Sequence, residues 1–87
     1  MNAVDRILAG VVFADVIAEI LRYPGWPSDL IHAASIVGEE AGELVKAVND
    51  YTWCKTHTEE AKQGLRAEVR KEAIHTAAMA IRFLINL

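Results

Sequence analysis

The chain has 87 residues, of which 53% are hydrophobic and 24% are charged, and its formal net charge is −3. This length suits a single domain spanning residues 1–87, and the composition excludes a disordered chain. The acidic balance, without any basic run, argues against a nucleic-acid polymer as the partner. So much apolar surface in a short chain predicts a homodimer or homotetramer, because a small monomer cannot bury it.

Cysteine content and the N-terminal segment bear on the cellular compartment. The single cysteine, Cys54, cannot form an internal disulfide, which favours a reducing environment. Asp5, Arg6 and Asp15 interrupt the apolar pattern of the N-terminal segment, unlike in a signal peptide. No uninterrupted apolar run approaches the ~20 residues of a membrane-spanning helix. We therefore expect a cytoplasmic protein with no membrane partner.

The first helix is predicted over residues 3–22, with Asn2 as its N-cap. Apolar residues occupy more than one side of this helix, which predicts that it is covered on more than one face. Asp15 and Glu19 lie one turn apart on it. We interpret them as a solvated strip, with contact to a partner subunit as the alternative.

The segment 23–27, YPGWP, breaks the chain into a turn because it holds two prolines and a glycine. Tyr23 and Trp26 either pack over the end of the bundle or line a pocket and stack on a base, and packing is favoured. Ser28 or Asp29 is the expected cap of the next helix.

The second helix is predicted from Leu30 to Val48, with an end somewhere within residues 49–53. Its apolar residues recur at alternating steps of four and three, the spacing of a buried helical stripe: Leu30, Ala34, Val37, Ala41, Leu44 and Val48. Glu40 and Glu43 fall at the edge of that stripe, one turn apart, and Glu39 points further toward solvent. Two carboxylates at this spacing repel each other unless a cation or a proton lies between them.

The last helix is predicted to open at Thr56 or Thr58 and to run to Leu84 or beyond. Five residues recur on it at steps of four and three and therefore share one face: Glu68, Glu72, His75, Met79 and Arg82. Ionisable groups on such a face are costly to bury unless they are paired or bind a metal.

A short connection predicts that the second and third helices pack antiparallel. Glu40 and Glu43 would then face Glu72 and either Glu68 or His75. Hard divalent cations relieve the repulsion among such carboxylates, and Mg²⁺ fits an oxygen-rich site best. The alternative is a set of interhelical salt bridges with the basic residues Lys46, Arg66, Arg70 and Lys71.

The stretches GEEAGELVKA and EVRKEAIHTAAMAIRFL resemble the MazG-like, all-α nucleoside triphosphate pyrophosphohydrolases. Family members carry an EExxE motif on one helix and an ExxD motif on a later one, and the similarity covers roughly residues 28–85. The resemblance implies an antiparallel bundle of three main helices, completed by homo-oligomerisation. It also implies Mg²⁺-dependent cleavage of a nucleoside triphosphate to the monophosphate and pyrophosphate. Glu40, Glu43 and Glu72 would be metal ligands, and Glu39 would hold or activate the attacking water.

One position departs from the family pattern, because His75 stands where the family has the aspartate of ExxD. Imidazole is a poor ligand for Mg²⁺ and suits Mn²⁺ or Zn²⁺ better. Three outcomes are open. Glu68 supplies the missing oxygen; His75 contacts the phosphates or a water beside a three-carboxylate site; or the site is weakened and the protein has another role.

Candidate substrate contacts are basic, amide or aromatic residues near the motifs. Those for the phosphates are Lys46, Arg70, Lys71 and Arg82, and those for the base are Trp26, Asn49, Tyr51 and Trp53. Each of them also suits ordinary packing or a salt bridge. Two rival hypotheses stand beside the pyrophosphohydrolase: a non-catalytic helical oligomerisation or nucleotide-binding module, and a relative that acts on phosphoribosyl-ATP.

Overall fold

Three α-helices make up the described part of the chain, residues 1–55 and 58–87 of a computed structural model. They are α1 (Ala3–Arg22), α2 (Leu30–Thr52) and α3 (Glu59–Ile85), in agreement with the predicted segments. No strand occurs within these residues. The predicted all-α class is therefore confirmed.

The caps explain where each helix begins. The Asn2 side chain accepts a hydrogen bond from the Asp5 N–H at 2.8 Å, and the Asp29 carboxylate accepts two from the first turn of α2. Thr58 Oγ1 accepts from the Ala61 N–H at 3.3 Å. Each cap satisfies an N–H group that the helix itself leaves unpaired. Of the alternatives from the sequence, Asp29 and Thr58 are the caps, and Thr56 lies outside the described residues.

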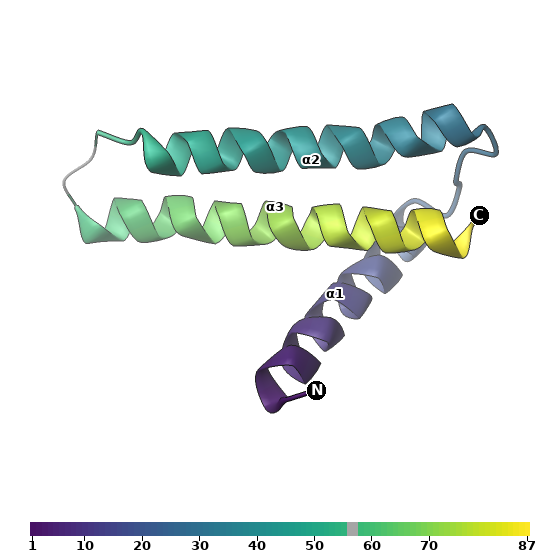
Figure 1. Cartoon of the computed structure of the whole chain (residues 1–87), viewed down its shortest axis with the longest axis horizontal. Helices are drawn as coiled ribbons and strands as arrows, with labels where there is room; N and C mark the ends of the chain where they lie inside the picture. Colours follow the sequence, from purple (N-terminus) through teal and green to yellow (C-terminus); the bar gives the residue numbers. More distant parts are fainter. Residues whose placement is uncertain (56–57) are drawn as a thin grey trace.

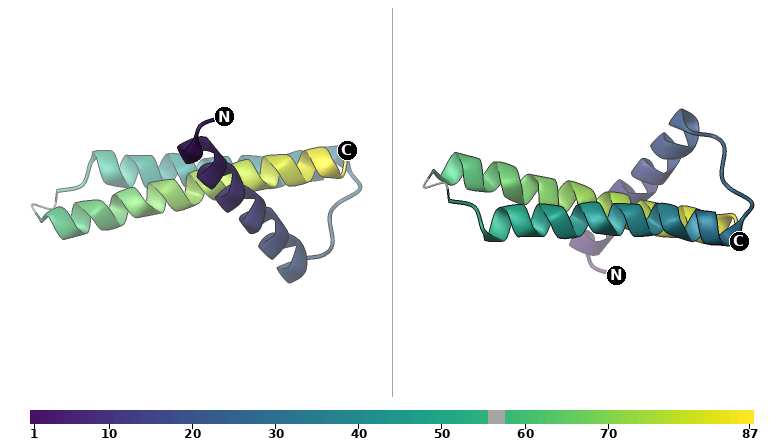
Figure 2. Two further views of the ribbon diagram at one scale, coloured as in Figure 1. Left: turned by 90° about the horizontal axis from the view of Figure 1, so that it is seen from below. Right: turned by 90° about the horizontal axis from the view of Figure 1, so that it is seen from above.

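α2 and α3 lie side by side and antiparallel along the long axis of the molecule, as Figure 1 shows. α1 crosses α3 obliquely and does not run along the pair (Figure 2). In the described residues, α3 packs closely against both other helices, whereas α1 and α2 make no such backbone approach to each other. α3 is therefore the central element, and any side chain on its buried face lies near one or both of its neighbours.

The hydrophobic core is small and lies where α1 crosses α3. Val16, Ala78 and Met79 form a buried cluster, and partly buried side chains of all three helices pack against it. Ala78 has no exposed surface, so the small side chain permits the two helices to approach. No large side chain of the described residues is fully buried.

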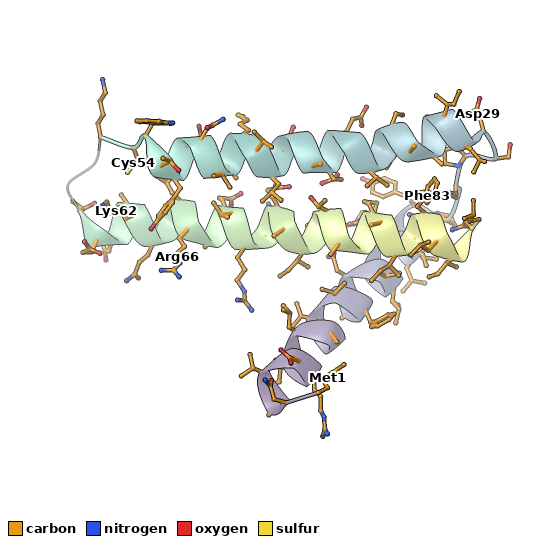
Figure 3. All side chains as sticks on the ribbon, viewed as in Figure 1. Met1, Asp29, Cys54, Lys62, Arg66 and Phe83 are labelled. Carbon is orange, nitrogen blue, oxygen red and sulfur yellow. The ribbon has the colours of Figure 1, made fainter. Side chains whose placement is uncertain are left out.

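Much of the apolar surface stays uncovered in the single chain. Figure 3 shows side chains around Met1, at the free end of α1, standing clear of the other two helices. More exposed large hydrophobic residues lie on α1 than on either other helix: Val4, Ile7, Leu8, Val11, Phe13, Ile17 and Leu21. The prediction that α1 is covered on more than one face is not met within one chain.

Candidate active site

The buried face of α2 is rotated slightly from the predicted one. The residues that turn inward are Ala33, Val37, Glu40, Leu44 and Ala47, while Leu30, Ala34 and Val48 are exposed. This stripe has the same four-and-three spacing but is centred one residue earlier in the chain, with Ala41 of the predicted stripe half-buried at its side. Glu40 consequently lies on the buried face and is half-buried, whereas its neighbours Glu39 and Glu43 are exposed. The sequence predicted both Glu40 and Glu43 at the edge of the buried face; the structure has Glu40 half-buried and Glu43 exposed.

Glu40 faces α3, where Glu72 and His75 are also half-buried. Burial raises the pKa of the Glu40 carboxyl, because the ionised form loses its hydration. His75 opposes that rise, and the negative charges of Glu72, Glu19 and Glu43 add to the rise of the pKa. The acidic motif of α2 and the glutamate of α3 thus meet, as antiparallel packing predicted.

Close to Glu40 and Glu72 lies a depression of about 90 Å³ between α2 and α3. Glu43 lines it from α2, and Glu68 and Glu72 line it from α3, with Lys46 and Asp50 at the same surface. Glu72 is therefore shared between this depression and the surroundings of Glu40. Glu68 also approaches Lys71, with 3.9 Å between the nearest nitrogen and oxygen, and both side chains are exposed.

α1 adds two carboxylates that the sequence did not place here. Asp15 and Glu19 are half-buried, and their oxygens lie with a ring nitrogen of His75 within 4.8 Å of one another. The interpretation of Asp15 and Glu19 as a solvated strip was wrong, because α1 crosses α3 with that face inward. Glu19 also meets the exposed Arg22 guanidinium at 3.5 Å. The only sequence signal was the i, i+4 spacing of two acids on a largely apolar helix.

Arg82 is buried, with 3% of its surface exposed, and lines the same hollow as Glu19 and Glu40. Its guanidinium donates to the backbone carbonyls of Glu19 at 3.4 Å and Gly25 at 3.2 Å, and also to that of Tyr23. These bonds tie the C-terminal end of α1 and the following turn to α3. Arg82 thus has a structural function, whereas the sequence indicated a possible phosphate contact.

Trp26 packs over Arg82, with the guanidinium carbon 4.9 Å from the ring centroid. The packing interpretation of Trp26 is therefore confirmed. Beside this pair is a hollow of about 270 Å³, lined by both acidic and aromatic side chains. The residues that line it include Glu19, Glu40, Tyr23 and Trp26.

The remaining candidates are spread over the surface. Arg70 and Lys71 are exposed along a shallow cleft of about 490 Å³ between α1 and α3, which Asp15 and His75 also line. Lys46 borders the depression that contains Glu43. Asn49 and Tyr51 are exposed on the last turns of α2, and Trp53 is 76% exposed just beyond them. Asn49, Tyr51 and Trp53 are not among the residues that line the carboxylate depression.

Comparisons with protein-family models, with curated proteins and with solved structures find no match to this chain. No helix in the described residues is long and apolar enough to cross a membrane.

Proposed function

We propose that the protein is a Mg²⁺-dependent nucleoside triphosphate pyrophosphohydrolase that acts in the cytoplasm. The observation that supports this proposal best is the meeting of Glu40 from α2 with Glu72 from α3. The pKa of Glu40 is raised, first by burial and then by surrounding negative charges, which include those of Glu72 and Glu43. Perturbed carboxylates in a shared site are typical of catalytic and metal-binding positions.

The donor chemistry fits a magnesium ion. Carboxylate oxygens are the ligands that Mg²⁺ prefers. Burial is the main cause of the raised pKa of Glu40, and a cation would offset the negative charges that add to this rise. Glu40, Glu43 and Glu72 would hold the metal. Glu68 lines the depression together with Glu43 and Glu72. When bound, such a metal neutralises phosphate charge and orients the attacking water.

The residues of the chain would divide the remaining work. Glu39 is exposed beside Glu40 and would accept the proton of the water that attacks the α-phosphorus. Lys46 borders the carboxylate depression and is the best-placed basic residue for the phosphates. Arg70 and Lys71 line the cleft on the α1 side and would act there only if the triphosphate extends across α3. Arg82 would not contact the phosphates, because its guanidinium donates its hydrogen bonds to backbone carbonyls.

A homo-oligomer forms part of the proposal. The exposed large side chains of α1 form an apolar surface that α2 and α3 leave open. A second copy that covered this surface would remove apolar area from water, and each Å² removed contributes roughly 25 cal/mol of stabilising free energy. The small core of the single chain makes such a contribution important for stability.

The substitution Glu43→Gln tests the role of the carboxylates. Glutamine keeps the volume and helix propensity of the side chain but removes the charge that would bind the metal. We expect a loss of nucleotide hydrolysis with unchanged helix content by circular dichroism. The matched control is Glu60→Gln, an exposed glutamate at the start of α3, which should keep full activity. Equal activity in both variants would remove Glu43 from the proposed site.

A further inference from the structure

Asp15, Glu19 and His75 form a cluster of possible metal ligands where α1 crosses α3. The cluster joins two carboxylates of one helix to an imidazole of another, and their donor atoms lie within 4.8 Å of one another. His75 Nε2 is 3.9 Å from Asp15 Oδ1. This separation is too long for a hydrogen bond, which spans about 2.7–3.2 Å. It is within the about 4.4 Å that can separate two donors sharing a cation through bonds of about 2.0–2.2 Å, so a bound ion would draw the side chains of the cluster closer together.

Asp15 has a second property that points to a ligand. Its other oxygen, Oδ2, is buried and has no hydrogen-bond partner in the described part of the chain. Leaving a buried polar atom unpaired is unfavourable, because the atom loses its hydration without gaining a hydrogen bond. A cation bound by Asp15 would satisfy the carboxylate that the protein groups leave without a hydrogen bond.

We propose that Asp15, Glu19 and His75 bind a divalent cation of borderline softness, of the class of Zn²⁺ or Co²⁺. The imidazole nitrogen selects these ions over Mg²⁺, whereas the carboxylates Glu40, Glu43 and Glu72 offer oxygen alone. His75 would therefore bind this ion together with α1, beside the carboxylates of α2. The proposal does not depend on nucleotide hydrolysis.

The cation would tie α1 to the helical pair. α1 packs closely only against α3 within the described residues, and the buried core at their crossing is small. A metal bonded to both helices would hold this crossing closed. Amide hydrogen exchange in α1 should then slow when the metal is added, more than exchange at the far ends of α2 and α3, because local opening of α1 would require the metal bonds to break.

The test is a titration of the metal-free protein with Co²⁺, followed by its visible absorption, with Zn²⁺ affinity measured by calorimetry. We expect one ion per cluster. In His75→Gln the affinity should fall at least about tenfold, because even groups that merely orient a metal ligand contribute about 10- to 100-fold. The matched control is His32→Gln, at an exposed histidine of α2, which should bind like the wild type. Asp15→Asn should weaken binding as well, which provides a second variant if His75→Gln folds poorly.

Two results would overturn the proposal. One is the absence of stoichiometric Co²⁺ or Zn²⁺ binding by the wild-type protein. The other is binding that survives in both His75→Gln and Asp15→Asn but disappears in Glu43→Gln, which would place the ion among the α2 carboxylates. Hydrolysis of nucleotides with Mg²⁺ but no His75-dependent binding would leave the proposed function standing without this site. Metal binding that depends on His75, in a protein that hydrolyses no nucleotide, would support this site and contradict the proposed function.

Discussion

The Arg82 guanidinium of α3 lies over the Trp26 ring of the turn between α1 and α2, 4.9 Å from the ring centroid. The same guanidinium donates to backbone carbonyls at the end of α1 and in that turn. One buried side chain therefore connects segments that are almost sixty residues apart in the sequence. Glu19, whose backbone carbonyl is one of these acceptors, lines the same hollow as Glu40.

Replacing Arg82 with methionine should destabilise the protein by about 2–4 kcal/mol. Methionine keeps much of the volume but removes the charged hydrogen bonds, worth about 1.5–3 kcal/mol, and the cation–π contact. Urea unfolding followed by circular dichroism measures the change. The exposed Arg66 offers a control, since Arg66→Met should change the free energy of unfolding by less than about 0.5 kcal/mol. Similar effects of the two substitutions would contradict the role assigned to Arg82.

Glu40→Gln should stabilise the metal-free protein at neutral pH. A carboxyl whose pKa is raised on folding contributes stability below its ordinary value of 4.5, and that contribution is lost as the pH rises through the folded-state value. Ionised Glu40 therefore opposes folding at pH 7, and glutamine removes that cost. Thermal melts in a chelator at pH 7 and pH 4 check this, with the advantage of the variant expected only at pH 7. Glu39→Gln, at the exposed neighbour, should show no such difference, and a less stable Glu40→Gln at pH 7 would contradict the assignment.

Ala78→Leu tests the close approach of α1 and α3. Ala78 has no exposed surface and packs in the cluster with Val16 and Met79. A larger side chain must push the helices apart, and overpacking of this kind costs about 1–3 kcal/mol. The free energy of unfolding from urea titration gives the effect. Ala61→Leu, at an exposed position of the same helix, should be nearly neutral, and an equally neutral Ala78→Leu would mean that the crossing is looser than described.

Ile17→Glu should convert the proposed homo-oligomer into a monomer. Ile17 is 59% exposed on the apolar surface of α1, and a charge there would be desolvated by a second copy. Sedimentation velocity at micromolar protein concentration distinguishes the two states. Ile31 is 83% exposed but lies on α2, so Ile31→Glu should keep the association. A wild-type monomer, or equal effects of both substitutions, would contradict the assignment of the interface to α1.

The sequence was sufficient to predict the helices, because caps and periodicity are local properties. Asn2, Asp29 and Thr58 start the helices. Of the residues predicted to share one face of α3, Glu72, His75, Met79 and Arg82 do lie on its inward face, whereas Glu68 is exposed. The meeting of Glu40 with Glu72 followed from antiparallel packing alone. These inferences required no knowledge of how α1 docks.

The two carboxylates that α1 contributes could not be predicted from the sequence, because apolar residues lie on all sides of that helix. Its periodicity therefore does not determine which side faces α3, and both Asp15 and Glu19 were assigned to solvent. The function of Arg82 was missed for a related reason, since its partners are backbone carbonyls of a distant segment. Backbone groups carry no residue identity that a sequence pattern can reveal.

The central claim is tested most directly by product analysis with the wild-type protein. The protein would be incubated with each common ribonucleoside and deoxyribonucleoside triphosphate in Mg²⁺, and separately in Mn²⁺, and the nucleotides resolved by chromatography. The account predicts nucleoside monophosphate and pyrophosphate in equal amounts, without a diphosphate intermediate, and dependence on the divalent cation. Release of diphosphate and inorganic phosphate, or no turnover of any nucleotide with either metal, would contradict it.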